Sequence, residues 1–445
     1  MVQRRDFLRL GAATAGALAF GPDFWRRAYA APAQPGPGPY GPLAGREPDA
    51  NGIILPDGFE SQLLARAGQV VPGTDYEWHA FPDGGATFPA DDGGWTYVSN
   101  SEVPGGGGVS ALQFDGEGRV VDARRILSGT STNCAGGPTP WGTWLSCEEV
   151  PAGRVWECDP SGRRQGEVRP ALGTFKHEAV TVDDGDERLY LTEDEPDGRF
   201  YRFTPASYPD LSEGVLEVAV VADDATVTWR EVPSPTEIDT PTRQQVPGST
   251  AFNGGEGIWF DSGVVYFTTK GDDVVRGYHV ADARMEVVYD AGVLDAPPLT
   301  GVDNVTVAPS GDLFVCEDGG NMELVLITPD RVVAPFLKVT GQDASELTGV
   351  AFDPSGRHLY VSSQRGLGGG GVTYGVTGPF RAGEARDRPT STLGEVAAGD
   401  GGNDDTDLAV PLTVAGVGVG AAAAGALVWR ARRSGGATPP APPAG

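Results

Sequence analysis

A short pattern recurs six times along this chain: an aromatic residue, then an aliphatic residue or Phe, then Ser, Thr or Cys. The aromatic residues stand at positions 97, 144, 190, 266, 314 and 360, so four intervals measure 46 to 48 residues and one measures 76. A period in the forties, with about four short strands per unit, is typical of a β-propeller blade. The repeat therefore predicts an all-β fold, a six-bladed β-propeller. The six triplets are Tyr97-Val98-Ser99, Trp144-Leu145-Ser146, Tyr190-Leu191-Thr192, Tyr266-Phe267-Thr268, Phe314-Val315-Cys316 and Tyr360-Val361-Ser362.

A second short run precedes each triplet. It begins 10 to 12 positions before the aromatic residue in four units, and Cys134 and Gly85 stand in its place in the other two. When two antiparallel strands share a tight turn, the start of the first and the end of the second lie at one edge. If the first strand lines the channel, residues at the strand starts and at the strand ends should lie at one mouth. The strand starts, which should form an inner ring, carry Cys134, Glu178, Glu256 and Asp303. The strand ends, which should surround this ring, carry Asn100, Glu102, Glu148, Glu149, Glu193, Asp194, Glu317 and Asp318.

So many carboxylates imply bound cations, because like charges a few ångströms apart raise one another's pKa and repel. Oxygen-rich sites suit calcium, whereas a thiolate among carboxylates favours a transition metal such as iron. The alternative is that these are ordinary acidic loop residues at strand ends. The balance of 61 acidic against 33 basic residues argues against nucleic acid as a partner.

The N-terminus carries a targeting pattern. Arg4-Arg5 forms a twin-arginine motif, residues 11–20 are apolar but too short to span a bilayer, and Ala28-Tyr29-Ala30 offers a cleavage site. Residues 1–30 are expected to be a twin-arginine signal peptide that exports the folded protein. An ordinary basic N-terminal helix is the alternative.

The C-terminal region contains an uncharged apolar segment. Residues 408–429 would rise roughly 33 Å as a helix, enough to cross the hydrocarbon core, and three arginines follow within residues 430–433. We predict a transmembrane helix over 408–429 and a cytoplasmic tail over 430–445, which would anchor the protein at the extracytoplasmic face of the membrane. Because Gly and Ala dominate the segment, a low-complexity apolar tail is the alternative.

Two segments of biased composition separate these ends from the repeats. Residues 31–50 are rich in Pro and Gly, as in an extended linker, and residues 381–407 form an acidic segment that predicts a stalk. The propeller domain is then expected over 51–380.

Several motifs within this domain resemble the PhoX-type alkaline phosphatases. The run from Cys134 to Glu149 is the most specific of them, and the others follow in the family's order. They are Phe175-Lys176-His177-Glu178-Ala179, Leu191-Thr192-Glu193-Asp194, Phe200-Tyr201-Arg202-Phe203, Glu256-Gly257, Cys316-Glu317-Asp318-Gly319-Gly320 and the segment from Val372 to Phe380.

The resemblance implies an iron and calcium cluster that hydrolyses phosphate monoesters. Cys134 would be the iron thiolate, and Glu178 and Glu256 would be carboxylates of the iron and bridging shell, which makes these three the catalytic residues. Calcium would be held by Asn100, Glu149, Asp194, Asp303 and Glu317. Lys270 and Arg365 follow the same strand-end pattern, so they could bind the phosphate of a small ester; exposed surface charge is the alternative for both.

Other functions and roles remain open from the sequence. A calcium-dependent lactonase or esterase could use a similar propeller, and so could a noncatalytic propeller that binds calcium and a partner. His177 is expected to be structural, because strand alternation directs it away from the channel if Glu178 points inward. Cys147 and Cys158 could pair in an oxidising compartment. We expect the protein to act as a monomer.

Overall fold

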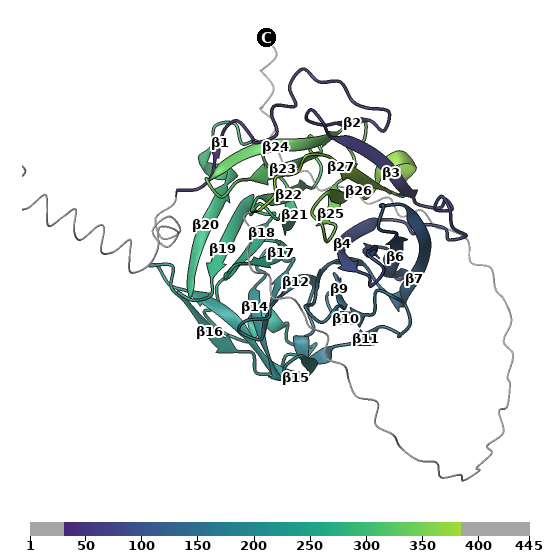
Figure 1. Ribbon diagram of the computed structural model, residues 1–445. Coiled ribbons are helices and arrows are strands. Elements are labelled where there is room, and N and C mark those ends of the chain that lie inside the picture. The colour runs from purple at the N-terminus through teal and green to yellow at the C-terminus, as the bar shows by residue number, and fades with distance from the viewer. Residues whose placement is uncertain (1–30, 384–445) are drawn as a thin grey trace, which may run out of the picture. The chain divides into compact units, whose positions relative to one another are not determined.

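Six β-sheets surround a common axis in the computed structural model, which describes residues 31–383 (Figure 1). The predicted signal peptide, transmembrane helix and tail, and all but the first three residues of the predicted stalk, lie outside the described residues. Within residues 31–383, every helix is too short or too polar to cross a membrane. The six-bladed propeller predicted from the repeat is confirmed.

Each blade is built from consecutive antiparallel strands. Blade 1 contains β4 (Pro82–Pro89), β5 (Trp95–Ser101), β6 (Gly107–Phe114) and β7 (Val120–Thr130). Blade 2 contains β8 (Asn133–Pro138), β9 (Trp144–Glu148), β10 (Val155–Cys158) and β11 (Glu167–Val168). Blade 3 contains β12 (His177–Asp183), β13 (Arg188–Glu193), β14 (Phe200–Ser207), β15 (Asp210–Val221) and β16 (Val227–Glu231).

The second half of the ring repeats this arrangement. Blade 4 contains β17 (Gly255–Asp261), β18 (Val264–Thr269), β19 (Val274–His279) and β20 (Arg284–Asp290). Blade 5 contains β21 (Val302–Val307), β22 (Leu313–Glu317), β23 (Glu323–Ile327) and β24 (Val332–Val339). Blade 6 contains β25 (Leu347–Phe352), β26 (His358–Ser363) and β27 (Val372–Thr377). Short helical turns are η1 (Pro170–Leu172), η2 (Thr242–Gln244), η3 (Ala291–Val293) and α2 (Gly366–Gly369).

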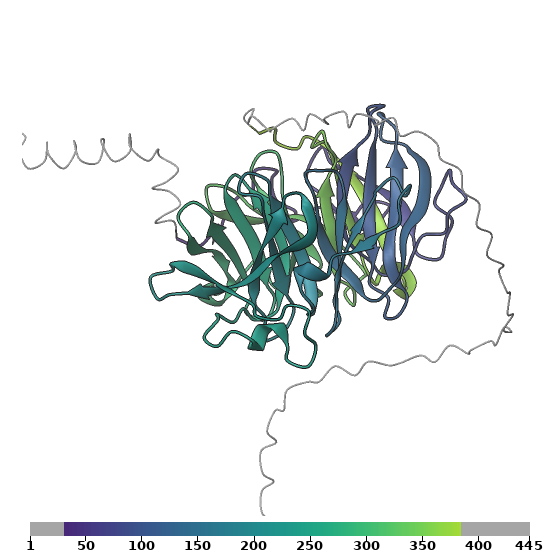
Figure 2. The same ribbon diagram turned by 90° about the horizontal axis from the view of Figure 1, so that it is seen from below.

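The first strand of each blade is innermost. The strands β4, β8, β12, β17, β21 and β25 contact one another in this order, and β25 contacts β4, so the ring is closed (Figure 1). In the view of Figure 2 the strands run from one end of the propeller to the other. The hairpin turns therefore lie at these two ends. All six predicted aromatic triplets lie in the second strands, as the hairpin argument requires.

The N-terminal segment completes the fold. The strand β3 (Glu60–Arg66) pairs with β27 as the outermost strand of blade 6, so the two ends of the propeller close one sheet. Upstream, β1 (Gln34–Pro35) and β2 (Ile53–Ile54) both pair with β24 of blade 5. The segment predicted as a linker, residues 31–50, is therefore extended along blade 5.

Aromatic side chains fill the space between blades. The rings of Tyr97 and Tyr360 lie 4.8 Å apart between blades 1 and 6, and those of Phe200 and Phe267 lie 4.6 Å apart between blades 3 and 4. All four residues are buried. Such pairs add about 0.5–1.5 kcal/mol each beyond the burial of their area, so aromatic side chains, the repeated Tyr97 and Tyr360 among them, stabilise the contact between blades.

The cysteines stay unpaired. Cys147 lies opposite Val155, and Cys158 lies opposite Trp144, three residues further along the same strand pair. Both thiols are buried and free. The possible disulfide between Cys147 and Cys158 is therefore absent, because the strand register separates the two residues along the sheet.

Candidate metal centre

An extra residue in each first strand brings one side chain to the channel mouth. In blade 2, Asn133 pairs with Glu148 and the next pair is Gly136 with Ser146, so Cys134 and Ala135 together oppose one residue. A β-bulge of this kind redirects a side chain and is common next to active sites. The same shift occurs in all six blades, one residue later in blade 6. We define the inner ring as the residue that follows the first paired residue of each first strand: Asp83, Cys134, Glu178, Glu256, Asp303 and, in blade 6, Thr348, which is itself paired with Ser362.

A repeated backbone hydrogen bond places a second set of side chains around the inner ring. In every blade the residue after the second strand donates its N–H to the carbonyl of the residue before the first strand, at 2.7–3.2 Å. This bond closes the open end of each hairpin, so the following side chains lie at the same mouth. We call these residues the collar: Glu102, Glu149, Asp194, Lys270, Asp318 and Gln364.

The inner ring and the collar converge on one cluster. Four groups of three residues, described in residues 31–383, each have ligand atoms within 4.8 Å of one another. The groups share Glu102, Asp303 and Glu346, so they form one continuous set of eight carboxylates and one thiol. The groups are Glu102–Cys134–Glu149, Asp83–Glu102–Glu346, Glu178–Glu256–Asp303 and Asp303–Asp318–Glu346.

Burial makes this cluster unfavourable unless cations neutralise it. Glu178 and Glu256 are 0% and 2% exposed. Burial raises the pKa of both well above the usual value; neighbouring carboxylates add to the shift, and Lys270 opposes it at Glu256. Burial also raises the pKa of Glu102 and of Asp303 to about 7. The buried Oε2 of Glu178 has no hydrogen-bond partner. A buried acceptor without a partner is rare in folded proteins, and a bound cation at this position would satisfy it.

Three basic side chains reach the cluster from its rim. Lys270 Nζ lies 2.8 Å from Glu256 Oε1 and 3.3 Å from Asp318 Oδ2. Arg365 lies 2.6 Å from Glu346 Oε1 and 3.6 Å from Glu102 Oε2. Lys176 contacts Glu149 and Asp194. Three positive charges cannot balance eight carboxylates, so the mouth retains a negative excess that suits multivalent cations.

The donor set fits both predicted metals. Carboxylate oxygens are the ligands that calcium prefers, and they surround most of the cluster. The Sγ of Cys134 lies 3.2 Å from Glu178 Oε1 and belongs to the group with Glu102 and Glu149. A sulfur among carboxylates suits a transition metal such as iron. Burial and nearby carboxylates raise the pKa of the Cys134 thiol, so thiolate formation there requires a cation.

Five of the eight predicted metal ligands lie in the cluster. They are Cys134, Glu178, Glu256, Glu149 and Asp303. Of the predicted phosphate-binding residues, Lys270 and Arg365 both lie against its carboxylates.

The other three predicted ligands have protein partners instead. The Asn100 amide donates to the carbonyls of Cys134 and Ala135, and its Oδ1 accepts hydrogen bonds from Trp144 and Ser146. Glu317 accepts from the backbone N–H groups of Thr300 and Glu323. Asp194 binds Lys176. Asn100 and Glu317 thus support the backbone that carries the ligands, and their metal-binding role remains a prediction.

Two residues of the cluster, Asp83 and Glu346, were not predicted from the sequence. Asp83 precedes its aromatic residue by 14 positions, whereas the other inner-ring carboxylates and Cys134 precede theirs by 10 to 12. This spacing selects Gly85 instead of Asp83 in the first unit. Glu346 stands before a first strand, and the hairpin argument considered only the strand itself. Glu102 and Asp318 were expected at the mouth but were not predicted as ligands.

His177 has the structural role expected for it. Its Nε2 lies 3.2 Å from the Gly173 carbonyl, and its ring centroid lies 3.5 Å from that of Phe175. Complete burial lowers the pKa of His177 to about 3, so the imidazole is neutral. The side chain therefore cannot supply a positive charge to the cluster.

Small residues close the channel below the inner ring. The residues that follow the inner ring are Gly84, Ala135, Ala179, Gly257, Asn304 and Gly349, and the hollow that they line measures about 30 Å³. A Cβ atom on Gly257 would lie 2.6 Å from the Cα of Asn304. About one water molecule fits in such a space, so the cluster opens to solvent at one mouth.

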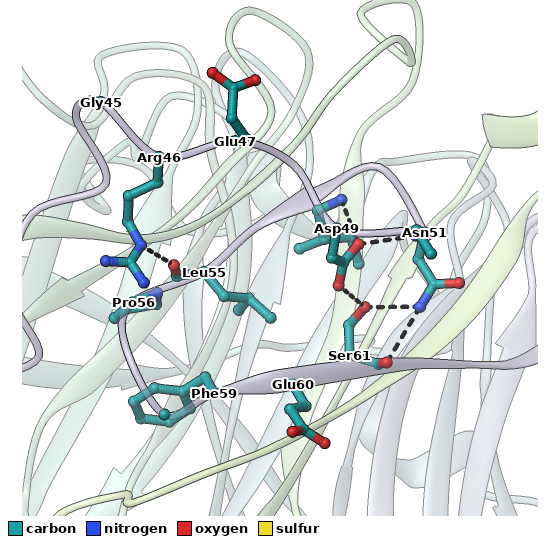
Figure 3. Close-up of a pocket in the computed structure, with 13 residues that line it drawn as sticks. Gly45, Arg46, Glu47, Asp49, Asn51, Leu55, Pro56, Phe59, Glu60 and Ser61 are labelled. Carbon is teal, nitrogen blue, oxygen red and sulfur yellow. Dashed lines mark hydrogen bonds between the residues drawn. The ribbon is translucent and has the colours of Figure 1, made fainter.

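A separate surface hollow lies near the other end of blade 6 (Figure 3). It is bordered by residues 45–61, and Ser61 pairs with Val376, far along the strands from the mouth residue Ser363. Its polar groups satisfy one another: Asn51 Nδ2 lies 2.8 Å from Ser61 Oγ, and Arg46 Nε donates to Leu55 O at 2.5 Å. The described groups of potential metal ligands do not include its residues. The acidic mouth is therefore the better candidate site.

A closed propeller with buried carboxylates and a thiol at one mouth defines a candidate metal-binding propeller. The family model described as alkaline phosphatase PhoX matches residues 117–154, 151–292 and 285–366, which together span more than half of the chain. The chain therefore belongs to the PhoX family of alkaline phosphatases, and the predicted resemblance is confirmed. None of the curated proteins matches the sequence.

Solved structures with a similar fold include the PhoX protein of Pseudomonas fluorescens in complex with vanadate. It shares 18% identity, with a TM-score of 0.62, and the match covers 76% of this chain and 98% of that one. A gluconolactonase from Xanthomonas campestris shares 15% identity with a TM-score of 0.45, over 79% of this chain and 99% of that one. At such identities the likeness concerns the fold alone.

Proposed function

We propose that this protein is a phosphomonoesterase whose cluster holds iron and calcium at the propeller mouth. The convergence of eight carboxylates and the Cys134 thiol, with Glu178 Oε2 left without a partner, carries the proposal. Membership of the alkaline phosphatase family supports the reaction class. Small phosphate esters are the proposed substrates.

The residues of the mouth suit phosphoryl transfer. Bound metal ions supply charge neutralisation and activate water for attack on phosphorus. Cys134, Glu178 and Glu256 would hold the transition metal, while Glu149 and Asp303, with Asp83, Glu102, Asp318 and Glu346, supply oxygen ligands for calcium. Lys270 and Arg365 lie at the rim, where an ammonium and a guanidinium can bind phosphoryl oxygens through charge-assisted hydrogen bonds.

We further propose that the protein is exported through the twin-arginine route and anchored by residues 408–429. The proposal is supported by Arg4-Arg5 and by the uncharged C-terminal segment. Among the described residues, Arg381 pairs with Asp312, at the strand ends opposite the mouth. Cell fractionation with a C-terminal tag tests this proposal: recovery in the cytoplasm would contradict it.

The activity is tested on the purified full chain. We expect hydrolysis of a chromogenic phosphate monoester with calcium present, iron in the protein by elemental analysis, competitive inhibition by orthovanadate, and loss of turnover after chelation. Hydrolysis of a lactone without hydrolysis of the phosphate ester would instead indicate the lactonase alternative. Bound calcium without turnover on either substrate would indicate a noncatalytic binding protein.

A further inference from the structure

Lys176 occupies a position of the mouth that the metal chemistry leaves unexplained. It immediately precedes β12, and its carbonyl accepts the repeated backbone hydrogen bond from Asp194. Its Nζ lies 2.8 Å from Glu149 Oε1 and 2.6 Å from Asp194 Oδ2. The ammonium therefore bridges two neighbouring collar carboxylates.

The same position differs from blade to blade. The residues before the six first strands are Phe81, Thr132, Lys176, Gly254, Gly301 and Glu346, so only blades 3 and 6 place a charge there. Glu346 belongs to two of the candidate metal groups. Lys176 carries the opposite charge, and its partner Asp194 belongs to none of the groups found in the described residues. One backbone position thus supplies a metal ligand on one side of the ring and a cation on the opposite side.

We propose that Lys176 takes the place of a metal ion between Glu149 and Asp194 and positions Glu149, beside Cys134, as an oxygen ligand of the cluster. The inference rests on the proposed metal-dependent function. Two adjacent carboxylates need a positive charge between them, and the lysine ammonium is a compact point charge that provides it without a bound metal. Asp194 is then a partner of Lys176 and not a calcium ligand.

The position of Glu149 makes Lys176 relevant to the reaction. Glu149 belongs to the group with Glu102 and Cys134, and it also bonds to Lys176. The thiol of Cys134 has a partner of its own, Glu178 Oε1 at 3.2 Å. Lys176 contacts a proposed ligand and not the metal, so it acts as a positioning residue.

The inference predicts how many calcium ions the full chain binds. In equilibrium dialysis with calcium alone, Lys176→Met should bind one more ion per chain than the wild type, because the Glu149–Asp194 pair becomes free. Lys176→Arg retains the charge and should bind the wild-type number. Lys338→Met is the matched control, since Lys338 pairs with Glu323 at 3.5 Å and is similarly exposed. An unchanged number in Lys176→Met would overturn the inference.

A second variant decides the question even if Lys176→Met fails to fold. Asp194→Asn should bind as many calcium ions as the wild type, whereas a loss of one ion would make Asp194 a ligand and refute the inference. A wild-type protein that binds no calcium would contradict the proposed function. In that case, one ion bound by Lys176→Met would still support the role of Lys176.

Discussion

Replacing Asp303 by Asn should stabilise the metal-free protein at alkaline pH. Burial raises the pKa of Asp303 to about 7 from the usual 3.8, with Lys270 opposing the shift and Asp318 adding to it. The folded protein therefore holds a proton that the unfolded chain releases, and ionising the group costs folding free energy as pH rises through that range. At about 1.4 kcal/mol per pH unit, the cost is roughly 4 kcal/mol at about pH 8 and roughly 2 kcal/mol at about pH 5.

The amide cannot ionise, so the variant avoids this cost. Asn304 can still donate its Nδ2 hydrogen bond, which reaches Asp303 Oδ1 at 2.8 Å in the wild type. Relative to the wild type, Asp303→Asn should gain on the order of 2 to 3 kcal/mol of unfolding free energy between about pH 5 and pH 8. Burial lowers the pKa of His79 and His177 to about 3, and their contribution cancels because both proteins contain them.

Urea unfolding of the metal-free full chain measures this difference. Calcium should reverse the order, because it binds the folded wild type through the carboxylate and stabilises it by mass action. Asp282→Asn, at an exposed turn, is the control and should change stability by less than about 0.5 kcal/mol. The reasoning is refuted if the difference between Asp303→Asn and the wild type does not change with pH, or if calcium stabilises both proteins equally.

Three further variants examine the sulfur, the rim and the channel. Cys134→Ser should lose bound iron and turnover together while keeping its circular dichroism spectrum. A variant that keeps both its iron and its turnover would exclude Cys134 as the iron ligand. Lys270→Met should raise KM on the order of tenfold, because a charge-assisted hydrogen bond contributes about 1.5–3 kcal/mol, and steady-state kinetics would contradict the role if KM stayed the same. Gly257→Ala should destabilise the protein by about 1–3 kcal/mol through overpacking against Asn304, whose Cα lies 2.6 Å from the new Cβ. Gly185→Ala, whose nearest neighbour would lie at 3.4 Å, should show a much smaller shift in melting temperature.

The propeller could be predicted from the sequence because its repeat is carried by a buried residue. Each aromatic residue of the triplets occupies the second strand of a blade, and packing between blades requires a large side chain there. The one long interval, 76 residues, corresponds to the extra strand β16 and the connection that contains η2. Insertions at a surface connection lengthen the period without changing the core.

The mouth could be predicted only in part, because hairpin geometry gives the end of a strand and not the direction of a side chain. Glu317 and Asp318 are adjacent, yet the first binds backbone N–H groups and the second enters the cluster. The β-bulge decides which first-strand residue points inward, and it has no simple sequence signal. This is why Asp83, in a longer hairpin, was missed while Glu178 was found.

The neutralisation of the cluster depends on contacts that cross from one hairpin to another. Lys176 reaches back to Glu149 in blade 2, and Lys270 reaches forward to Asp318 in blade 5. Sequence spacing within one unit cannot reveal such pairs, because the partner lies in the neighbouring repeat. The same backbone hydrogen bond recurs at the mouth in all six blades, so the chemistry there is determined by which blades place a carboxylate, a thiol or an ammonium. Under the proposed function, a charge reversal at one position, as between Lys176 and Glu346, would exchange an internal cation for a metal ligand without altering the fold.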